Sequence, residues 1–325
     1  MFSVNQEAVK LVKEEIIPKA EQLNVEILHL NNGTTVIDMG VNKSGSLSAG
    51  ILFTEATFGG LGWAQFGYFK KGEINLPSID VYIDKPREGT LSSQFSGWKL
   101  PRKDLAIAPI GSGPARAIAK NDIFSQCVEY QDNHHEVVFG AQTTILPDEE
   151  ITSSIAKQCN ISPENLYVLA ATTGSLVGTI QVCSRTVEAT MWRLYKKGFD
   201  IYTVISGIGT CPIPPQTKDE LVAMDRVNTA LIYGASVHYI VDWDDNKIEK
   251  IIKELPFSAS KRFGTSFLEI FEEGERDFYK VDKDVHTIAH YTISNINSGR
   301  TFSAGIIRED ILESSFFRTG RQNGA

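Results

Sequence analysis

The architecture that we expect is decided by one stretch of the chain, Ser175-Leu176-Val177-Gly178-Thr179-Ile180-Gln181-Val182-Cys183, followed directly by Ser184-Arg185-Thr186-Val187-Glu188-Ala189-Thr190-Met191-Trp192. Its first half alternates apolar with small or polar residues, which predicts a strand, and its second half has apolar residues at helical spacing. The stretch therefore predicts a strand that runs into a helix. Arg185 and Glu188 would then stand on the first turn of that helix, on one side, with Trp192 beneath them.

The Arg185 and Glu188 pair has two interpretations. An arginine and a glutamate three residues apart on a helix commonly form a surface ion pair that contributes little energy. The position of this pair just past a predicted strand, with an aromatic residue on the same side, favours a functional pair that does not face open water.

Strands and helices alternate on both sides of this stretch. A hairpin is predicted over residues 25–40, around Asn31-Asn32-Gly33, and another over 291–305, around Asn297-Ser298-Gly299. Further strands are predicted at 78–83, 105–110, 136–140, 166–171, 203–208 and 237–241, and helices at 4–16 (ended by Pro18), 147–158, 218–233, 244–254 and 263–272. Without a long linker or repeat, this order predicts one α+β (mixed α/β) unit over 1–317, made of two intimate, interwoven subdomains with a cleft between them. The polar residues 318–325 are predicted to be a frayed tail.

Composition limits the possible partners. The 325-residue chain has a net charge of −8, which argues against nucleic acid because phosphate binding needs clustered Lys and Arg. No apolar run approaches the ~20 residues that cross a bilayer. The four cysteines are far apart in the sequence, which indicates free thiols and a reducing, cytoplasmic compartment rather than disulfides or a zinc ribbon.

Two smaller motifs could bind ligands. Gly111-Ser112-Gly113-Pro114 follows a predicted strand and places proline at the start of a helix, an arrangement that serves either an anion or a purely structural turn. The six histidines invite a metal site, but His134 and His135 are adjacent and would point apart on a strand. We therefore expect no metal.

Several segments together resemble the methenyltetrahydromethanopterin cyclohydrolase family, in the same order and over nearly the whole chain. They are Gly111-Ser112-Gly113-Pro114-Ala115-Arg116, Ser175-Leu176-Val177-Gly178 with residues 181–188, Pro212-Ile213-Pro214-Pro215, and residues 295–304 followed by Glu309-Asp310. The first two segments are specific in combination, although neither is specific alone.

The resemblance implies a cytoplasmic homotrimeric enzyme of one-carbon metabolism that binds its pterin between two subdomains and needs no metal or organic cofactor. In this family, Glu188 would orient and polarise the attacking water, with Arg185 as its partner. The resemblance places Ser93, Gln94 and Tyr233 at the pterin. We also expect Gly111, Ser112 and Gly113 to contact the substrate.

Two departures from the family pattern concern the substrate. Phe95 stands where the family usually has lysine, and His286-Thr287-Ile288-Ala289-His290 replaces a Phe-Ala-Pro-Ala-like segment. Phe95 removes a cation from the expected pocket, and His286 changes its wall. A hydrolase of another cyclic amidine or formamidine is therefore an alternative, and so is a pterin-binding protein without catalysis. Retention of both Arg185 and Glu188 speaks against the latter.

Overall fold

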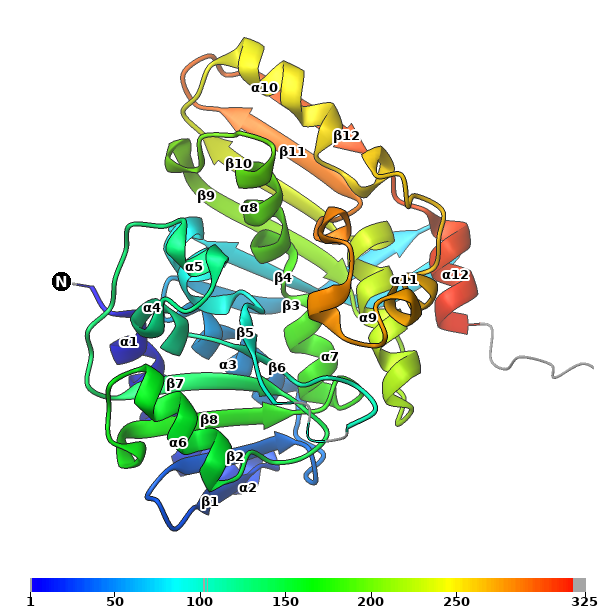
Figure 1. Ribbon diagram of the computed structural model, residues 1–325. Coiled ribbons are helices and arrows are strands. Elements are labelled where there is room, and N and C mark those ends of the chain that lie inside the picture. Colours follow the sequence, from blue (N-terminus) through cyan, green and yellow to red (C-terminus); the bar gives the residue numbers. More distant parts are fainter. Residues whose placement is uncertain (1, 102, 104, 318–325) are drawn as a thin grey trace, which may run out of the picture.

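The computed structural model describes residues 2–101, 103 and 105–317. The chain forms two six-stranded sheets, named sheet A and sheet B below, with helices packed between and around them (Figure 1). This arrangement confirms the predicted α+β class. The predicted tail at 318–325 lies outside the described residues.

Sheet A has the strand order β1-β2-β8-β7-β6-β5. Its inner strands β2, β8 and β7 run parallel, while β1, β6 and β5 pair antiparallel. The hairpin predicted around Asn31-Asn32-Gly33 is present as β1 and β2. The strands of sheet A are β1 (Glu26–His29), β2 (Thr35–Gly40), β5 (Trp98–Lys99), β6 (Ile110–Ser112), β7 (Val137–Gln142) and β8 (Leu166–Ala171).

Sheet B has the order β12-β11-β10-β9-β4-β3, and every pair except β10 and β11 is antiparallel. Since β3 and β4 belong to this sheet while β5 to β8 belong to sheet A, the chain crosses between the sheets repeatedly. The strands are β3 (Gly62–Lys71), β4 (Ile74–Ile83), β9 (Val204–Pro212), β10 (Ser236–Val241), β11 (His290–Asn295) and β12 (Thr301–Gly305).

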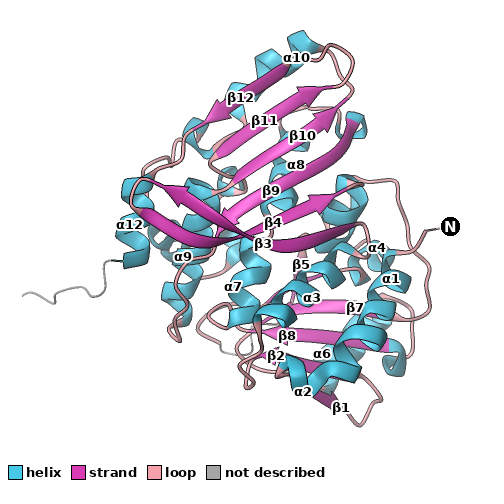
Figure 2. Cartoon of the chain, turned by 180° about the vertical axis from the view of Figure 1, so that it is seen from behind, coloured by secondary structure: helices cyan, strands magenta, loops and turns pink. Residues whose placement is uncertain are grey.

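The helices separate the sheets and cover their faces. Helices α3 and α7 pack on each other between the two sheets, and α8 and α9 lie on one face of sheet B. Figure 2 shows sheet B from its other side, with α8 and α9 behind the strands. The α-helices are α1 (Val4–Leu11), α2 (Ala20–Leu23), α3 (Leu47–Phe58), α4 (Ala115–Ala119), α5 (Ile123–Gln126), α6 (Glu149–Gln158), α7 (Leu176–Cys183), α8 (Thr186–Lys196), α9 (Glu220–Gly234), α10 (Asp245–Ile251), α11 (Phe267–Glu273) and α12 (Glu309–Phe317). Two wide turns of π-helix, η1 (Val12–Ile16) and η3 (Arg87–Gln94), complete the elements used below.

The strand predicted at 175–183 is wrong, because this segment is helix α7. The hydroxyl of Ser175 caps the helix by accepting a hydrogen bond from the Gly178 amide at 3.0 Å. Every residue from Val177 to Cys183 is buried, since helices and both sheets surround α7. A helix that is buried on all sides loses the 3.6-residue periodicity by which the sequence could reveal it.

Two other expectations also needed correction. The strand predicted over residues 105–110 begins only at Ile110, because Pro109 lacks the N–H that a sheet ladder requires. Pro18 does not end the first helical segment. It lies in a 3-10 turn (Ile17–Lys19) at a position where its missing N–H is not needed, and α2 follows directly.

Candidate active site

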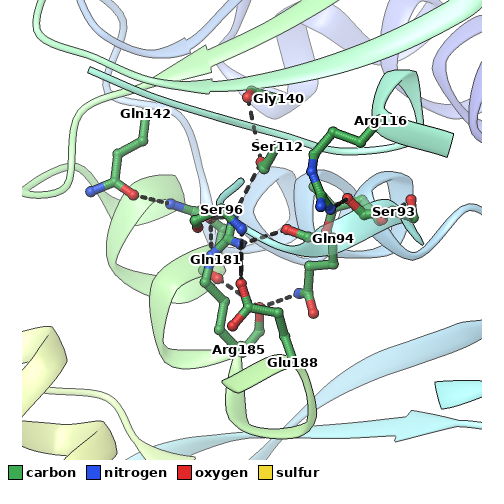
Figure 3. A network of polar contacts seen from close by, with 12 residues as sticks. Ser93, Gln94, Ser96, Ser112, Arg116, Gly140, Gln142, Gln181, Arg185 and Glu188 are labelled. Atoms are coloured by element: carbon green, nitrogen blue, oxygen red, sulfur yellow. Dashed lines mark hydrogen bonds and ion pairs between the residues drawn. The ribbon is translucent and has the colours of Figure 1, made fainter. Parts of the chain in front are cut away.

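The junction between α7 and α8 carries the predicted pair. Helix α7 ends at Cys183, and Arg185 is the N-cap residue of α8, which places Glu188 in the first turn. The two helices are consecutive and meet at a bend, so Gln181, Arg185 and Glu188 face one another across it (Figure 3). The spacing argument for the pair therefore holds although the first element is a helix.

Arg185 and Glu188 form a buried ion pair. Nη1 of Arg185 lies 3.1 Å from Oε1 of Glu188, and the side chains are only 7% and 6% exposed. The same Oε1 accepts a hydrogen bond from the backbone N–H of Ser96 at 3.0 Å. Among the described residues, no hydrogen bond reaches Oε2 of Glu188. One carboxylate oxygen is thus fixed, while the other is left for a ligand.

Arg185 is held by a set of acceptors around its guanidinium. It donates to the carbonyl oxygen of Gln94 at 2.6 Å, to Oε1 of Gln181 at 2.8 Å and to Oγ of Ser112 at 3.2 Å. Gln181 in turn donates to Oε1 of Gln142 at 3.2 Å, as the dashed lines in Figure 3 show. The guanidinium therefore joins α7, α8, η3 and the β6 turn, and its orientation is fixed from several sides.

Burial sets the protonation of the pair. Burial raises the pKa of the Glu188 carboxyl above the 4.5 of an ordinary glutamate, and the Arg185 guanidinium and the Ser96 amide oppose this rise. Burial also lowers the pKa of Arg185, but from a value so high that the guanidinium stays charged. The site thus combines a fixed cation with a carboxylate that takes up a proton more readily than a surface glutamate.

A mainly apolar cavity lies beside this pair. It contains about 560 Å³ of space that no atom fills, part of it open to solvent. Its wall is formed by helices α7, α8 and α9, by strands β6 and β7, and by the segments around Phe95 and around residues 278–287. The lining residues are Phe95, Ser96, Ile110, Gln142, Val182, Arg185, Glu188, Ala189, Met224, Asn228, Leu231, Ile232, Phe278, Val285, His286 and Thr287.

Phe95 and His286, the two departures from the family pattern, both line this cavity. Phe95 stacks on Phe124 with 3.9 Å between ring centroids and meets Trp192 edge-on at 6.3 Å. His286 stacks on Phe278 at 5.0 Å. The cavity wall at this end is therefore aromatic.

Ser93, Gln94 and the Gly111 to Gly113 turn lie next to the pair but are not among the residues that line the cavity. The Ser93 hydroxyl donates to the carbonyl oxygen of Thr57 at 2.6 Å. Gln94 contributes its backbone oxygen to Arg185, and its side-chain oxygen is buried without a partner among the described residues. Their contact with substrate stays a prediction.

The glycines of the β6 turn allow a close approach of backbones. A Cβ on Gly111 would lie 2.4 Å from the Phe139 ring, and Gly113 has a φ of +95°, which favours glycine. Arg116, which follows in α4, is fully buried and donates to both carboxylate oxygens of Asp122 and to the backbone oxygen of Ser93. These contacts support the purely structural interpretation of the turn, with Ser112 as its one direct link to the pair.

The structure does not bring Tyr233 to the cavity. Its side chain is fully buried, and its hydroxyl donates to the Thr265 carbonyl oxygen at 2.8 Å and accepts from the Gly264 amide at 2.9 Å. Tyr233 directs its ring toward Phe257 and Phe263, away from the wall that its neighbours Leu231 and Ile232 form. Tyr233 is therefore not among the residues that line the cavity, and its contact with substrate stays a prediction.

Some functional candidates were not expected from the sequence. Ser96 binds Glu188 through its backbone N–H, which no side-chain pattern reveals. Gln181 stands one helical turn before Arg185, a spacing that could have identified it had the segment been taken as a helix. Gln142 and Asn228 come from distant elements that only the fold brings together.

Within residues 2–101, 103 and 105–317, no group of three or more His, Cys, Asp or Glu side chains could hold a metal ion. The same residues include no helix that is long and apolar enough to span a membrane.

Comparison with known proteins identifies relatives of the chain along its length. A family model described as cyclohydrolase (MCH) matches residues 3–316. Proteins named methenyltetrahydromethanopterin cyclohydrolase from Methanothermobacter marburgensis, Methanocaldococcus jannaschii and Methanosarcina barkeri are 38%, 36% and 33% identical to this chain. Each alignment covers 97% of the chain and 98–99% of the relative. The chain is a cyclohydrolase and belongs to the methenyltetrahydromethanopterin cyclohydrolase family.

Proposed function

We propose that this protein hydrolyses the methenyl bridge of methenyltetrahydromethanopterin to the formyl form, in a reversible step of one-carbon metabolism. The relatives that bear this name align over almost their whole length, which supports the substrate. The observation that carries the mechanism is the buried carboxylate of Glu188 beside the cavity. Its Oε1 is fixed by Arg185 and Ser96, and its Oε2 has no hydrogen-bond partner among the residues that the structure describes. The proposal includes the homotrimeric assembly that the resemblance implies.

The reaction suits a site with one base and one fixed cation. The methenyl carbon lies between two nitrogens as a cationic amidinium, so it is already electrophilic. Water adds to this carbon while Glu188 accepts one of its protons, and a neutral tetrahedral adduct forms. The adduct's hydroxyl then loses its proton as the carbonyl forms, one C–N bond breaks, and the leaving nitrogen takes up a proton. One proton is released overall, and we propose that no metal or organic cofactor takes part.

Arg185 has two roles in this proposal. It keeps the carboxylate of Glu188 ionised against the effect of burial, since a neighbouring cation lowers a carboxyl pKa. It also holds the carboxylate in one orientation, so that the water is positioned against the substrate carbon. The carboxylate attracts the cationic substrate, and the apolar wall excludes competing water.

The test is the decay of the methenyl chromophore, followed by absorbance, with wild-type protein and with Glu188→Gln. The amide keeps the size of the side chain and an oxygen that can accept from Ser96 and Arg185. We expect kcat to fall by ~10²–10⁴-fold, the usual contribution of a general base, with little change in KM.

The pH dependence separates a base from a purely structural carboxylate. Because the pKa of Glu188 is raised, kcat of the wild type should decline on the acidic side at a higher pH than an ordinary glutamate would give. Glu188→Gln should lack this decline. Decay at the buffer rate with wild-type protein would refute the proposed activity. If the wild type then binds the compound, a non-catalytic pterin-binding protein is favoured; without binding, a hydrolase of another amidine is favoured.

A further inference from the structure

His286 has an unusual environment in the cavity wall. Its ring stacks on Phe278 and meets Phe95 edge-on at 6.2 Å, so two aromatic side chains fix its plane. Both ring nitrogens are buried, and neither has a hydrogen-bond partner among the described residues. The side chain nevertheless lines the cavity, to which it contributes part of its surface.

Five other polar side chains of this wall differ from His286, because they have partners within the protein. Gln142, Asn228 and Thr287 each form hydrogen bonds within the protein, and Arg185 and Glu188 bind each other. Leaving a buried donor or acceptor unpaired destabilises a protein, and natural structures seldom retain such groups without a reason. A ligand in the cavity that His286 lines can supply the missing hydrogen-bond partner.

We infer that His286 is a specificity-determining residue that hydrogen-bonds a polar edge of the substrate's heterocyclic ring system. This inference rests on the proposed function. A planar pterin presents ring nitrogens, an amino group and a carbonyl group along its edge, so it can accept from one imidazole nitrogen or donate to the other. Phe278 and Phe95 offer apolar surfaces to the same flat ring system.

The charge of His286 suits the substrate. Burial, together with the nearby Lys283, lowers the pKa of His286 to about 4, so the ring is neutral near pH 7. A neutral imidazole retains one donor and one acceptor, and it does not repel the cationic methenyl group. The charged residues of the cavity wall are then Arg185 and Glu188, which compensate each other.

The inference is tested with His286→Phe, which keeps an aromatic ring and removes both nitrogens. We expect KM for the methenyl pterin to rise by about 2- to 12-fold, corresponding to the loss of one hydrogen bond, with kcat within about twofold of wild type. We also expect the free variant to be at least as resistant to urea as the wild type, because two unpaired buried groups are gone. A merely structural histidine would not give both results.

Two further variants complete the design. His286→Gln restores a donor and an acceptor and should recover part of the affinity. His290→Phe is the matched control, since His290 lies on the same segment but contacts Ser303 in sheet B and does not line the cavity. It should leave KM unchanged.

An unchanged KM in His286→Phe, or a loss confined to kcat or to stability, would overturn the inference. Turnover by the wild type decides the proposed function separately. If the wild type binds the methenyl pterin without turning it over, the same fold-change is measured in the dissociation constant. If it does not bind, both the proposed function and the inference fail.

Discussion

Replacing Arg185 by methionine would remove the charge that compensates Glu188 while keeping an unbranched side chain in its place. Both side chains are more than nine-tenths buried and lie 3.1 Å apart, so solvent screens their attraction weakly. Two unit charges about 4 Å apart attract each other by roughly 4 kcal/mol at an effective dielectric constant of 20. Removing one partner of a buried pair typically costs ~3–5 kcal/mol. We therefore expect Arg185→Met to lower the free energy of unfolding by ~3–5 kcal/mol.

A double-mutant cycle isolates the pairwise part of this loss. Urea unfolding at pH 7 of the wild type, Arg185→Met, Glu188→Gln and the double variant should give a coupling energy of ~2–4 kcal/mol, because the double variant leaves no unpaired charge. The exposed pair Arg262 and Glu273, 2.8 Å apart, is the control and should give less than ~1 kcal/mol.

The pH dependence of the cycle has a defined sign. Burial raises the pKa of Glu188 in the folded protein, and loss of Arg185 raises it further. As the pH falls through this range, Glu188 becomes neutral and needs no counter-charge, so the destabilisation by Arg185→Met should shrink. The reasoning would be refuted if, at pH 7, the losses of the two single variants added up to the loss of the double variant to within ~0.5 kcal/mol.

Two other substitutions test the framework around the site. Gly178→Ala should lower the free energy of unfolding by ~1–3 kcal/mol or more, because its Cβ would lie 1.7 Å from the Thr172 carbonyl oxygen; unchanged urea unfolding would contradict this packing. Tyr233→Phe should cost ~1–3 kcal/mol through its lost bonds to Gly264 and Thr265, with kcat and KM unchanged. A higher KM of Tyr233→Phe with unchanged stability would instead indicate that Tyr233 contacts the substrate.

The sequence predicted the fold class and both hairpins because short-range signals determine them. Asn31-Asn32-Gly33 and Asn297-Ser298-Gly299 each mark a turn between alternating segments, and these pairings are present. The strand prediction for residues 175–183 is wrong because a helix that is buried on all sides, as α7 is, has no polar stripe. Helices α3 and α9, which pack against α7, come from distant parts of the chain. The local sequence therefore does not reveal that α7 is buried.

The Arg185 and Glu188 contact was predicted correctly because three residues along a helix bring two side chains together whatever precedes them. The Ser96 amide was missed because backbone groups carry no sequence signal. Tyr233 does not line the cavity, although its neighbours Leu231 and Ile232 do, because its own side chain leaves the helix in another direction. Which side chains of α9 face the cavity depends on how the helix is rotated against sheet B.

The bond from the Ser96 amide to Glu188 closes a loop between residues 92 positions apart, and the Tyr279 hydroxyl donates to the Trp98 carbonyl oxygen across 181 positions. Closing such loops costs chain entropy that local contacts cannot offset, so these contacts require both sheets to be in place. During synthesis, the cavity cannot form until the segment with Phe278 and His286 has left the ribosome. Onset of turnover in a growing or refolding chain would therefore mark the completion of the tertiary structure.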